Sequence, residues 1–238
     1  MASEMNCDNL GVMPRKVLDK LIEQAEGSLR LVEALGVREL SREAVEPGYR
    51  RKSELLRKLQ EEIGDCQRCQ LSQSRKLVVF GEGDPESEVF LVGEAPGESE
   101  DETGRPFVGA AGRILTDIIE RGMKLKRSRV FIANVVKCRP PKNRDPEPSE
   151  VDACRGFLEK QLKIVNPRVI IALGKIATQC LLKTTESITH LRGMWSEFLG
   201  IPVMPTYHPA YLLHNPSGKR ELWSDIKKVL ALLAEERK

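Results

Sequence analysis

Four short apolar runs, each followed by a helical pattern, constrain the fold of this chain more than any other feature. The runs cover residues 89–92, 130–133, 169–173 and 202–206. Short apolar runs that alternate with helices are typical of parallel strands buried on both faces. We therefore predict an α/β fold, a three-layer α/β/α arrangement with a central, mostly parallel four-stranded sheet.

The helices expected around these strands follow from apolar residues at helical spacing. They cover residues 55–63, 110–120, 149–165 and 223–233, with one more helix around Cys180. A separate amphipathic helix is expected over 14–35, and a polar linker that contains a Pro-Gly pair over 41–53. We therefore expect two parts, a helical extension with its linker over 1–52 and an α/β domain over 53–238.

Polar residues follow three of the expected strands. The segment Gly93-Glu94-Ala95-Pro96-Gly97 follows the first strand, Asn134 the second and His208 the last. Open α/β sheets bind their ligands beyond the carboxyl ends of the strands, so we predict an active site there. A nucleotide-phosphate loop is the weaker alternative, because neither Gly-Lys-Ser/Thr nor Gly-x-Gly-x-x-Gly occurs in the segment.

Four cysteines form two pairs, Cys66 with Cys69 and Cys138 with Cys154. The start of the chain has no basic segment followed by an apolar core, so we expect a cytoplasmic protein without a membrane partner, in which cysteines stay reduced. Ligation of a metal group is then the better interpretation, and the spacing leaves zinc and an iron–sulfur cluster both open.

The chain carries a net charge of +3, but its basic residues are unevenly distributed. Residues 121–144 contain nine Lys and Arg and no Asp or Glu. A surface segment of one sign beside a candidate site favours a polyanionic partner, and nucleic acid is the one we expect.

Together these motifs resemble the family 4 (iron–sulfur, thermostable-type) uracil-DNA glycosylases over residues 55–235. Besides the segment 93–97, the residues that carry the resemblance are Glu100-Asp101, Gly104-Arg105-Pro106-Phe107-Val108-Gly109, Asn134-Val135-Val136-Lys137-Cys138-Arg139-Pro140-Pro141, Asn143-Arg144 and His208-Pro209-Ala210-Tyr211-Leu212-Leu213. The resemblance implies a DNA repair enzyme that flips uracil out of DNA, hydrolyses its N-glycosidic bond and leaves an abasic site.

The resemblance also assigns substrate-binding roles. Phe107 would stack on the uracil ring, the Asn134 amide would pair with its O4 and N3–H, and Glu100 would form the pocket wall near C5. Close approach of the backbone to the substrate is expected at Gly93, Ala95 and Gly97, and Gly97 can also adopt a positive φ. The purely structural alternatives are a core aromatic for Phe107, a turn residue for Asn134 and a solvated acid for Glu100.

Two residues are implied as catalytic. Glu94 would position water and offset the positive charge on the sugar, and His208 would stabilise the departing uracil anion, with a neutral imidazole as one option. By the same resemblance, Cys66, Cys69, Cys138 and Cys154 would hold a structural [4Fe–4S] cluster. The motif 211–213 could supply an apolar wedge in DNA or simply begin a helix that packs on the core.

The resemblance leaves three points open. It says nothing of the acidic extension over 1–50, which either docks on the domain or binds a protein partner; no obligate partner is evident. The loop 137–144 contains no histidine, so we expect turnover rather than a covalent link to DNA. The alternative functions are a non-catalytic iron–sulfur module that binds nucleic acid and a zinc-ribbon-like interaction protein.

Overall fold

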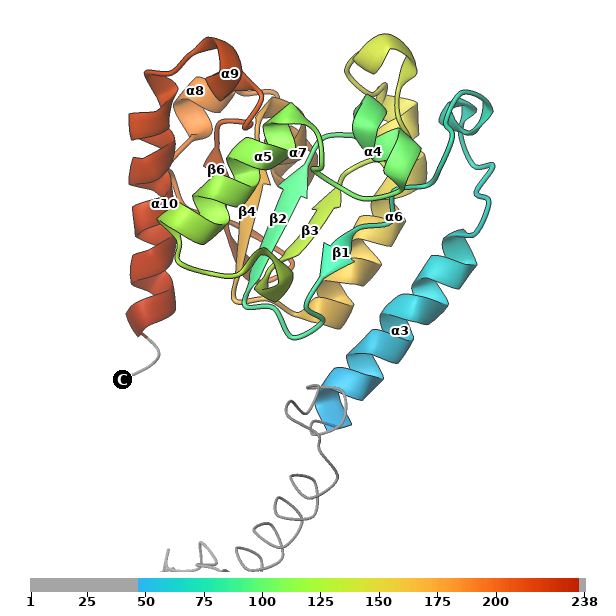
Figure 1. The fold of residues 1–238 in the computed structure, drawn as a ribbon, viewed down its shortest axis with the longest axis horizontal. Helices are drawn as coiled ribbons and strands as arrows, with labels where there is room; N and C mark the ends of the chain where they lie inside the picture. Colours follow the sequence, from blue (N-terminus) through green and yellow to red (C-terminus); the bar gives the residue numbers. More distant parts are fainter. Residues whose placement is uncertain (1–46, 236–238) are drawn as a thin grey trace, which may run out of the picture. The chain divides into compact units, whose positions relative to one another are not determined.

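The structure, a computed structural model, describes residues 47–235 (Figure 1). The helix expected over 14–35 lies outside the described residues, and the division between 52 and 53 stays a prediction. The first described helix, α3, spans Pro47–Ile63, so it begins earlier than the expected start at residue 55. The Pro-Gly pair assigned to the linker does not stop this helix, because proline is tolerated in a first helical turn, where its missing N–H has no partner.

The sheet confirms the α/β class and adds two edge strands. Its order is β1-β3-β2-β4-β6-β5. The four predicted strands are present and parallel: β2 at Val89–Gly93, β3 at Phe131–Asn134, β4 at Val169–Leu173 and β6 at Ile201–Thr206. The prediction of four strands is wrong in number, since β1 at Glu82–Gly83 and β5 at Ser196–Phe198 pair antiparallel with the two edges. Neither edge strand has the apolar run by which the central strands were found.

Helices occupy the connections between strands. Their bounds are α4 Glu98–Thr103, α5 Ala110–Asp117, α6 Pro148–Val165, α7 Lys175–Leu182, α8 Ile188–Leu191, α9 Tyr211–His214 and α10 Gly218–Glu235. The helix expected over 110–120 continues beyond α5 as a π-helical turn, Ile118–Gly122. Across the described residues, no helix combines the length and the apolar character needed to cross a lipid bilayer.

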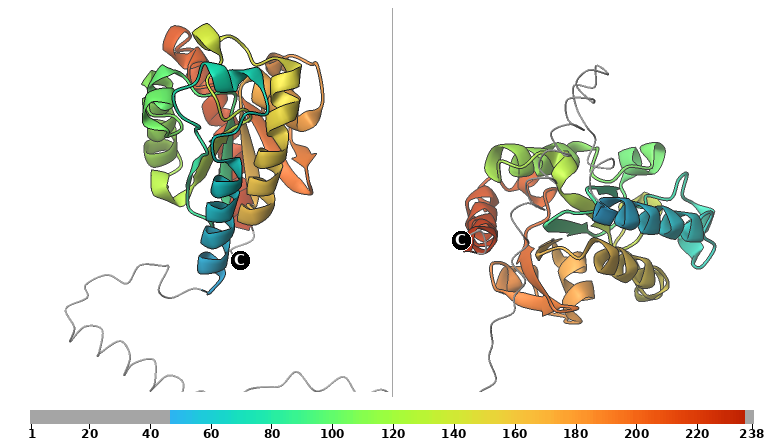
Figure 2. Two further views of the ribbon diagram at one scale, coloured as in Figure 1. Left: turned by 90° about the vertical axis from the view of Figure 1, so that its right-hand side faces the viewer. Right: turned by 90° about the horizontal axis from the view of Figure 1, so that it is seen from below.

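Alternate residues of each central strand point to opposite faces of the sheet, so two cores form. On one face, Leu91 packs with Leu115 of α5 and Ile226 of α10. On the other face, Phe90 packs with Phe157 of α6, and α7 and α3 cover the same face. Figures 1 and 2 show the sheet between these two helical layers, which is the three-layer arrangement predicted.

The strand register brings the polar motifs together. Gly93 at the end of β2 pairs with Asn134 at the end of β3, and Leu173 of β4 pairs with Thr206 of β6. Because the strands are parallel and in this register, the segments that follow them all emerge at one edge of the sheet. The site is built on that edge.

Candidate active site

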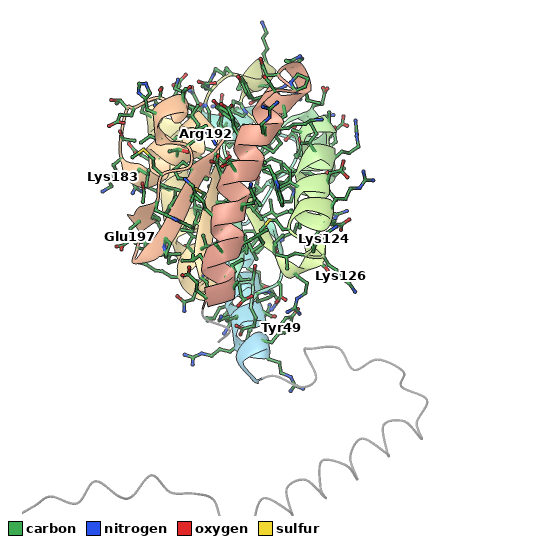
Figure 3. All side chains as sticks on the ribbon, turned by 90° about the vertical axis from the view of Figure 1, so that its left-hand side faces the viewer. Tyr49, Lys124, Lys126, Lys183, Arg192 and Glu197 are labelled. Atoms are coloured by element: carbon green, nitrogen blue, oxygen red, sulfur yellow. The ribbon has the colours of Figure 1, made fainter. Side chains whose placement is uncertain are left out.

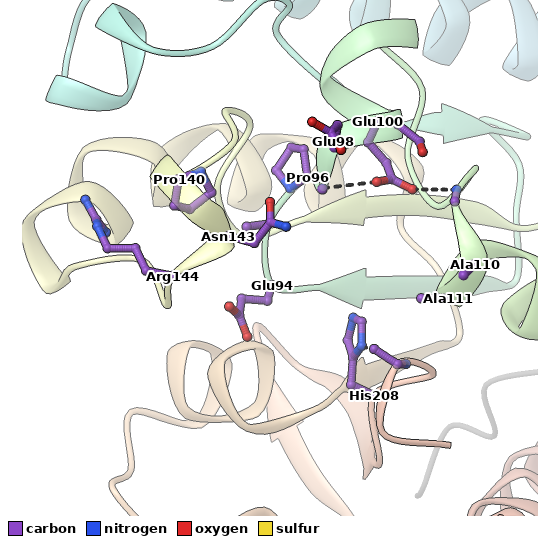
Figure 4. Close-up of a pocket in the computed structure, with 15 residues that line it drawn as sticks. Glu94, Pro96, Glu98, Glu100, Ala110, Ala111, Pro140, Asn143, Arg144 and His208 are labelled. Atoms are coloured by element: carbon purple, nitrogen blue, oxygen red, sulfur yellow. Dashed lines mark hydrogen bonds between the residues drawn. The ribbon is translucent and has the colours of Figure 1, made fainter. Parts of the chain in front are cut away.

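A pocket of about 430 Å³ lies at the carboxyl ends of the parallel strands (Figure 4). Five of the predicted site residues line it, namely Glu94, Ala95, Gly97, Glu100 and His208. Glu94 and His208 lie on one side of the pocket and Glu100 lies across from them (Figure 4). The loop after β3 completes the wall with Pro140, Asn143 and Arg144, which the sequence did not single out as pocket residues.

The other three predicted residues, Gly93, Phe107 and Asn134, lie against one another next to this pocket. A Cβ atom on Gly93 would stand 2.5 Å from Cζ of Phe107 and closer still to Oδ1 of Asn134. The Phe107 ring is also 5.6 Å from the imidazole of His208, between ring centroids. Glycine at position 93 therefore allows the aromatic ring and the amide to meet at the end of β2, a closer contact than any other residue permits.

Phe107 is both a core residue and a neighbour of the site. Its side chain is 6% exposed and packs in the core with Leu115. Its φ is +52°, a left-handed conformation that costs free energy for a residue with a side chain. Just before it, the carbonyl of Pro106 accepts a hydrogen bond from Nη2 of Arg127 at 2.7 Å, and the same guanidinium is paired with Glu82. Arg127 thus holds the strained segment in place.

The side chain of Asn134 is buried and incompletely bonded. Asn134 is 1% exposed, and its Oδ1 is the one buried side-chain polar atom without a hydrogen-bond partner among the described residues. Buried polar atoms in folded proteins are almost always hydrogen-bonded, because an unmet group keeps its full desolvation cost. Because this acceptor lies beside a pocket, a ligand in the pocket could supply the N–H donor that Oδ1 lacks.

The Glu94 carboxyl group has a perturbed acidity. Burial and, to a smaller extent, the charge of Asp145 raise the pKa of Glu94 to about 7, while the charge of Lys175 opposes the shift. The group therefore changes charge in the range in which catalytic acids and bases operate. Neither Asp145 nor Lys175 was predicted, although Lys175 stands just past β4 and so follows the same strand-end rule as the predicted residues.

His208 is held as a neutral imidazole. Burial lowers the pKa of His208 to about 4, and the charge of Glu100 opposes the shift only in part. The backbone N–H of Ala210 donates to Nδ1 at 3.1 Å, so Nδ1 is the acceptor and Nε2 carries the proton. Gly174, also missed in the sequence, makes room for this ring: its φ is +89°, and a Cβ there would stand 2.8 Å from Cβ of His208.

Glu100 joins two loops of the pocket. Its carboxylate accepts backbone hydrogen bonds from Val108 and Gly109, both at 2.8 Å, and from Gly97 at 3.1 Å. Two of these contacts are drawn in Figure 4. The alternative of a solvated acid is therefore wrong. Gly97 does not use its tolerance of a positive φ, since its φ is −87°; its missing side chain leaves room for the Glu100 carboxylate.

The four predicted cysteines reach one region of the core from three segments. Cys154 of α6 and Cys138 of the loop after β3 are buried in the core, and Cys66 and Cys69 pack against it. Burial raises the pKa of Cys154, and ionised Cys69 and Cys66 would raise it further, which shows that the thiols interact. N–H groups point at two of the sulfurs: Nη1 of Arg75 lies 3.4 Å from Sγ of Cys138, and the amide of Lys137 lies 3.3 Å from Sγ of Cys154.

This donor set suits a cluster of several irons. Among the described residues, no three His, Cys, Asp or Glu side chains stand close enough together to hold one metal ion. In a [4Fe–4S] cluster each thiolate binds a different iron, so the sulfurs do not have to meet at one point. Thiolates that ligate a metal are typically surrounded by N–H donors. The Arg75 guanidinium and the Lys137 amide supply such donors here.

The basic stretch at 121–144 is not the bare positive surface that its sequence indicated. Lys137 is fully buried, and Arg127 is paired inside the structure. Burial lowers the pKa of Lys137 to about 8, so its amine is mostly protonated at neutral pH. Acids from outside the stretch pair with others: Asp84 with Arg129, Glu98 with Arg139, and Glu147 and Glu150 with Arg144. Exposed lysines remain at Lys124, Lys126 and Lys142, the first two visible in Figure 3.

The motif at 211–213 has features of both alternatives, an apolar wedge and a helix packed on the core. Leu212 is 3% exposed and packs in the core, whereas Tyr211 and Leu213 are 43% and 46% exposed. One side of α9 thus anchors it and the other presents apolar side chains to solvent. A wedge in DNA, if this motif forms one, consists of Tyr211 and Leu213.

Comparison with known proteins identifies the family of the chain. Residues 80–227 match the profile described as Uracil DNA glycosylase superfamily. A type-4 uracil-DNA glycosylase of Sulfurisphaera tokodaii is 47% identical over 185 residues, covering 74% of this chain and 84% of that protein. The type-4 enzyme of Thermotoga maritima is 44% identical over 78% of this chain and 98% of its own length. A type-5 enzyme of Pyrobaculum aerophilum is 34% identical over only 56% of this chain. The chain belongs to the uracil-DNA glycosylase superfamily and, within it, to the type-4 uracil-DNA glycosylases.

Proposed function

We propose that the protein excises uracil from DNA as a monofunctional glycosylase, with Asn134 and Phe107 recognising the base and with Glu94 and His208 assisting the cleavage. A base in a duplex must leave the stack before its glycosidic bond can be reached. The Phe107 ring offers the flipped base a stacking face next to the pocket. The Asn134 amide can accept a hydrogen bond from uracil N3–H and donate one to O4.

One observation carries this assignment. Oδ1 of Asn134 is buried beside the pocket without a partner, and uracil N3–H is a donor of the kind it lacks. Cytosine has no proton at N3 and carries an amino group where uracil has O4, so it would leave the amide mismatched. Discrimination then comes from hydrogen bonds that only uracil completes.

Cleavage breaks the bond between the sugar C1′ and uracil N1, and the bonding electrons leave with the base. The N–H at Nε2 of His208 is available to donate to uracil O2, where the negative charge develops. A neutral imidazole can donate this hydrogen bond without first being protonated, which suits a histidine with a pKa of about 4. Ionised Glu94 offsets the positive charge on the sugar and orients the water that adds to C1′, whose proton it can accept.

We also propose that Cys66, Cys69, Cys138 and Cys154 hold a [4Fe–4S] cluster. When bound, the cluster ties together the segment after α3, the loop after β3 and helix α6. Its role is structural, because the cleavage just described uses no electron transfer. A cytoplasmic location and a protein partner for residues 1–50 stay predictions.

The test is release of uracil from an oligonucleotide with a single uracil, read as alkali-sensitive cleavage beside a thymine control. The protein is purified without oxygen so that any cluster is retained. We expect release at uracil only, no strand cleavage before alkali, and strongly reduced release by Glu94→Ala, Asn134→Ala and His208→Ala. Iron-loaded, folded protein that binds the oligonucleotide without releasing uracil would instead favour the non-catalytic binding module.

A further inference from the structure

Lys137 is the most unusual charged residue in the described structure. Its side chain is wholly buried, and Nζ donates to the backbone carbonyl of Asn134 at 2.8 Å and to Oε1 of Gln161 at 2.7 Å. Both acceptors are neutral, and no carboxylate among residues 47–235 forms an ion pair with Nζ. A buried ammonium without a counter-charge is strongly unfavourable, so this one requires an explanation.

The cysteine set adjoins Lys137. The backbone N–H of Lys137 donates to Sγ of Cys154, and Cys138 is the next residue in the chain. Arg75, whose side chain is 4% exposed, also points at Cys138 but already has Asp65 as its ion-pair partner. Thiolates that ligate iron are ionised, so a bound cluster would supply the counter-charge that Lys137 lacks.

The same ammonium fixes the backbone of the residue that faces the base. It holds the carbonyl of Asn134, at the last position of β3, while the Asn134 side chain lies beside the pocket. Gln161 continues the network by donating to the carbonyl of Phe80 at 2.8 Å, and the carbonyl of Lys137 accepts from Val79 at 2.8 Å. Lys137 therefore contacts the cysteine set through its amide and the base-recognition strand through its side chain.

We propose that Lys137 is a positioning residue that serves as the buried counter-ion of the cysteine-held cluster and holds the Asn134 backbone in place for recognition of uracil. This inference rests on the proposed cluster and on the proposed role of Asn134. It explains how a cluster that takes no part in the chemistry still supports catalysis. Loss of the cluster removes the charge that keeps the ammonium in position.

The experiment compares Lys137→Met, which keeps the length of the side chain but removes its charge and donors, with Lys142→Met. Lys142 carries the same charge on the same loop but is exposed, so its variant controls for a general loss of positive charge. For each purified holoprotein we would measure iron content, the rate at which the visible absorbance fades in air, inhibition by free uracil, and kcat and KM on uracil DNA.

For Lys137→Met we expect faster fading of the absorbance and roughly tenfold weaker inhibition by uracil, with kcat lowered and KM for DNA little changed. Lys142→Met should change only KM and its salt dependence. A purely structural role for Lys137 would alter the melting temperature without altering uracil inhibition in the folded protein. The inference is overturned if folded Lys137→Met matches the wild type in both absorbance lifetime and uracil inhibition.

A second variant, Gln161→Leu, removes one acceptor of the ammonium and leaves its charge, and it decides the matter if Lys137→Met does not fold. We expect weaker inhibition by uracil with an absorbance lifetime near that of the wild type. Unchanged uracil inhibition in this variant would contradict the positioning role. Wild-type protein without iron or without uracil release would instead contradict the proposed function, so the two failures are distinguishable.

Discussion

At the scale of single residues, acidity distinguishes the two groups proposed to assist cleavage. Burial raises the pKa of Glu94 to about 7 and lowers the pKa of His208 to about 4, so both shifts favour the neutral form. In the proposed mechanism His208 works in its neutral form, whereas Glu94 acts as the anion. The proposal therefore implies that activity requires Glu94 to lose its proton, while His208 never needs to gain one.

The pH dependence of kcat/KM tests this. We expect activity to rise with pH through about 7 as Glu94 ionises. Asp145→Asn removes a charge that raises the pKa of Glu94, so the rise should move to lower pH. Lys175→Met removes a charge that lowers this pKa, so the rise should move to higher pH. In Glu94→Gln the remaining activity should be flat between about pH 5 and 8, because His208 stays neutral there. A rise at the same pH in Glu94→Gln would assign it to another group.

A methyl group at position 93 gives a second prediction. Gly93→Ala should lower uracil release by roughly 100-fold or more, because the Cβ would push apart the Phe107 ring and the Asn134 amide. The crowding should lower the free energy of unfolding by about 1–3 kcal/mol. Gly156→Ala is the matched control, since a Cβ at Gly156 meets nothing within 4 Å. Retention of near wild-type activity by Gly93→Ala would show that this contact is not needed.

At the scale of elements, the strained segment at Phe107 depends on Arg127, which lies far from it in the sequence. Arg127→Met should leave the Pro106 carbonyl without its donor and the Glu82 carboxylate with Arg105 as its remaining partner. We expect the free energy of unfolding to fall by about 1–3 kcal/mol and kcat to fall by roughly 10- to 100-fold. Chemical denaturation and single-turnover assays would measure the two effects.

Arg121→Met removes the same charge from a side chain that is 82% exposed and is the control for Arg127→Met. If Arg127 acts mainly through attraction to DNA phosphates, both variants should weaken DNA binding equally and neither should change kcat. That outcome would restore the interpretation of 121–144 as a DNA-binding stretch.

The elements also show which features of the sequence were informative. The four central strands were predictable because burial on both faces demands continuous apolar runs. Strands β1 and β5 were not predictable in this way, because an edge strand pairs on one side only and does not need a continuous apolar run. The charge of the basic stretch at 121–144 was also misjudged from the sequence. The acids that pair with it, among them Asp84 and Glu98, come from distant segments. The same limit applies to the site, where Glu94 and His208 follow strand ends but Asp145 acts on Glu94 from a loop.

At the scale of the whole molecule, the cysteine set joins parts that are distant in the chain. Cys154→Ala should lower the melting temperature by at least about 5 °C, because three segments lose a common attachment. It should also weaken DNA binding, since Cys138 belongs to the loop 137–144 at the pocket. Cys180→Ala is the control, as this half-buried thiol lies outside the set. Differential scanning calorimetry and binding to uracil-free DNA would measure both, and a Cys154→Ala chain with unchanged values would contradict the structural role of the cluster.

The strand order has a consequence for how the protein is made. The site draws Glu94 from the segment after β2, Asn134 from the end of β3 and His208 from the segment after β6, and β6 pairs with β4 in the sheet. Chains emerge from the ribosome amino end first, so the base-recognition half of the site is synthesised well before the residue that assists departure of the base. A chain that ends before β6 lacks His208 and the strand that precedes it, so it cannot form the complete site.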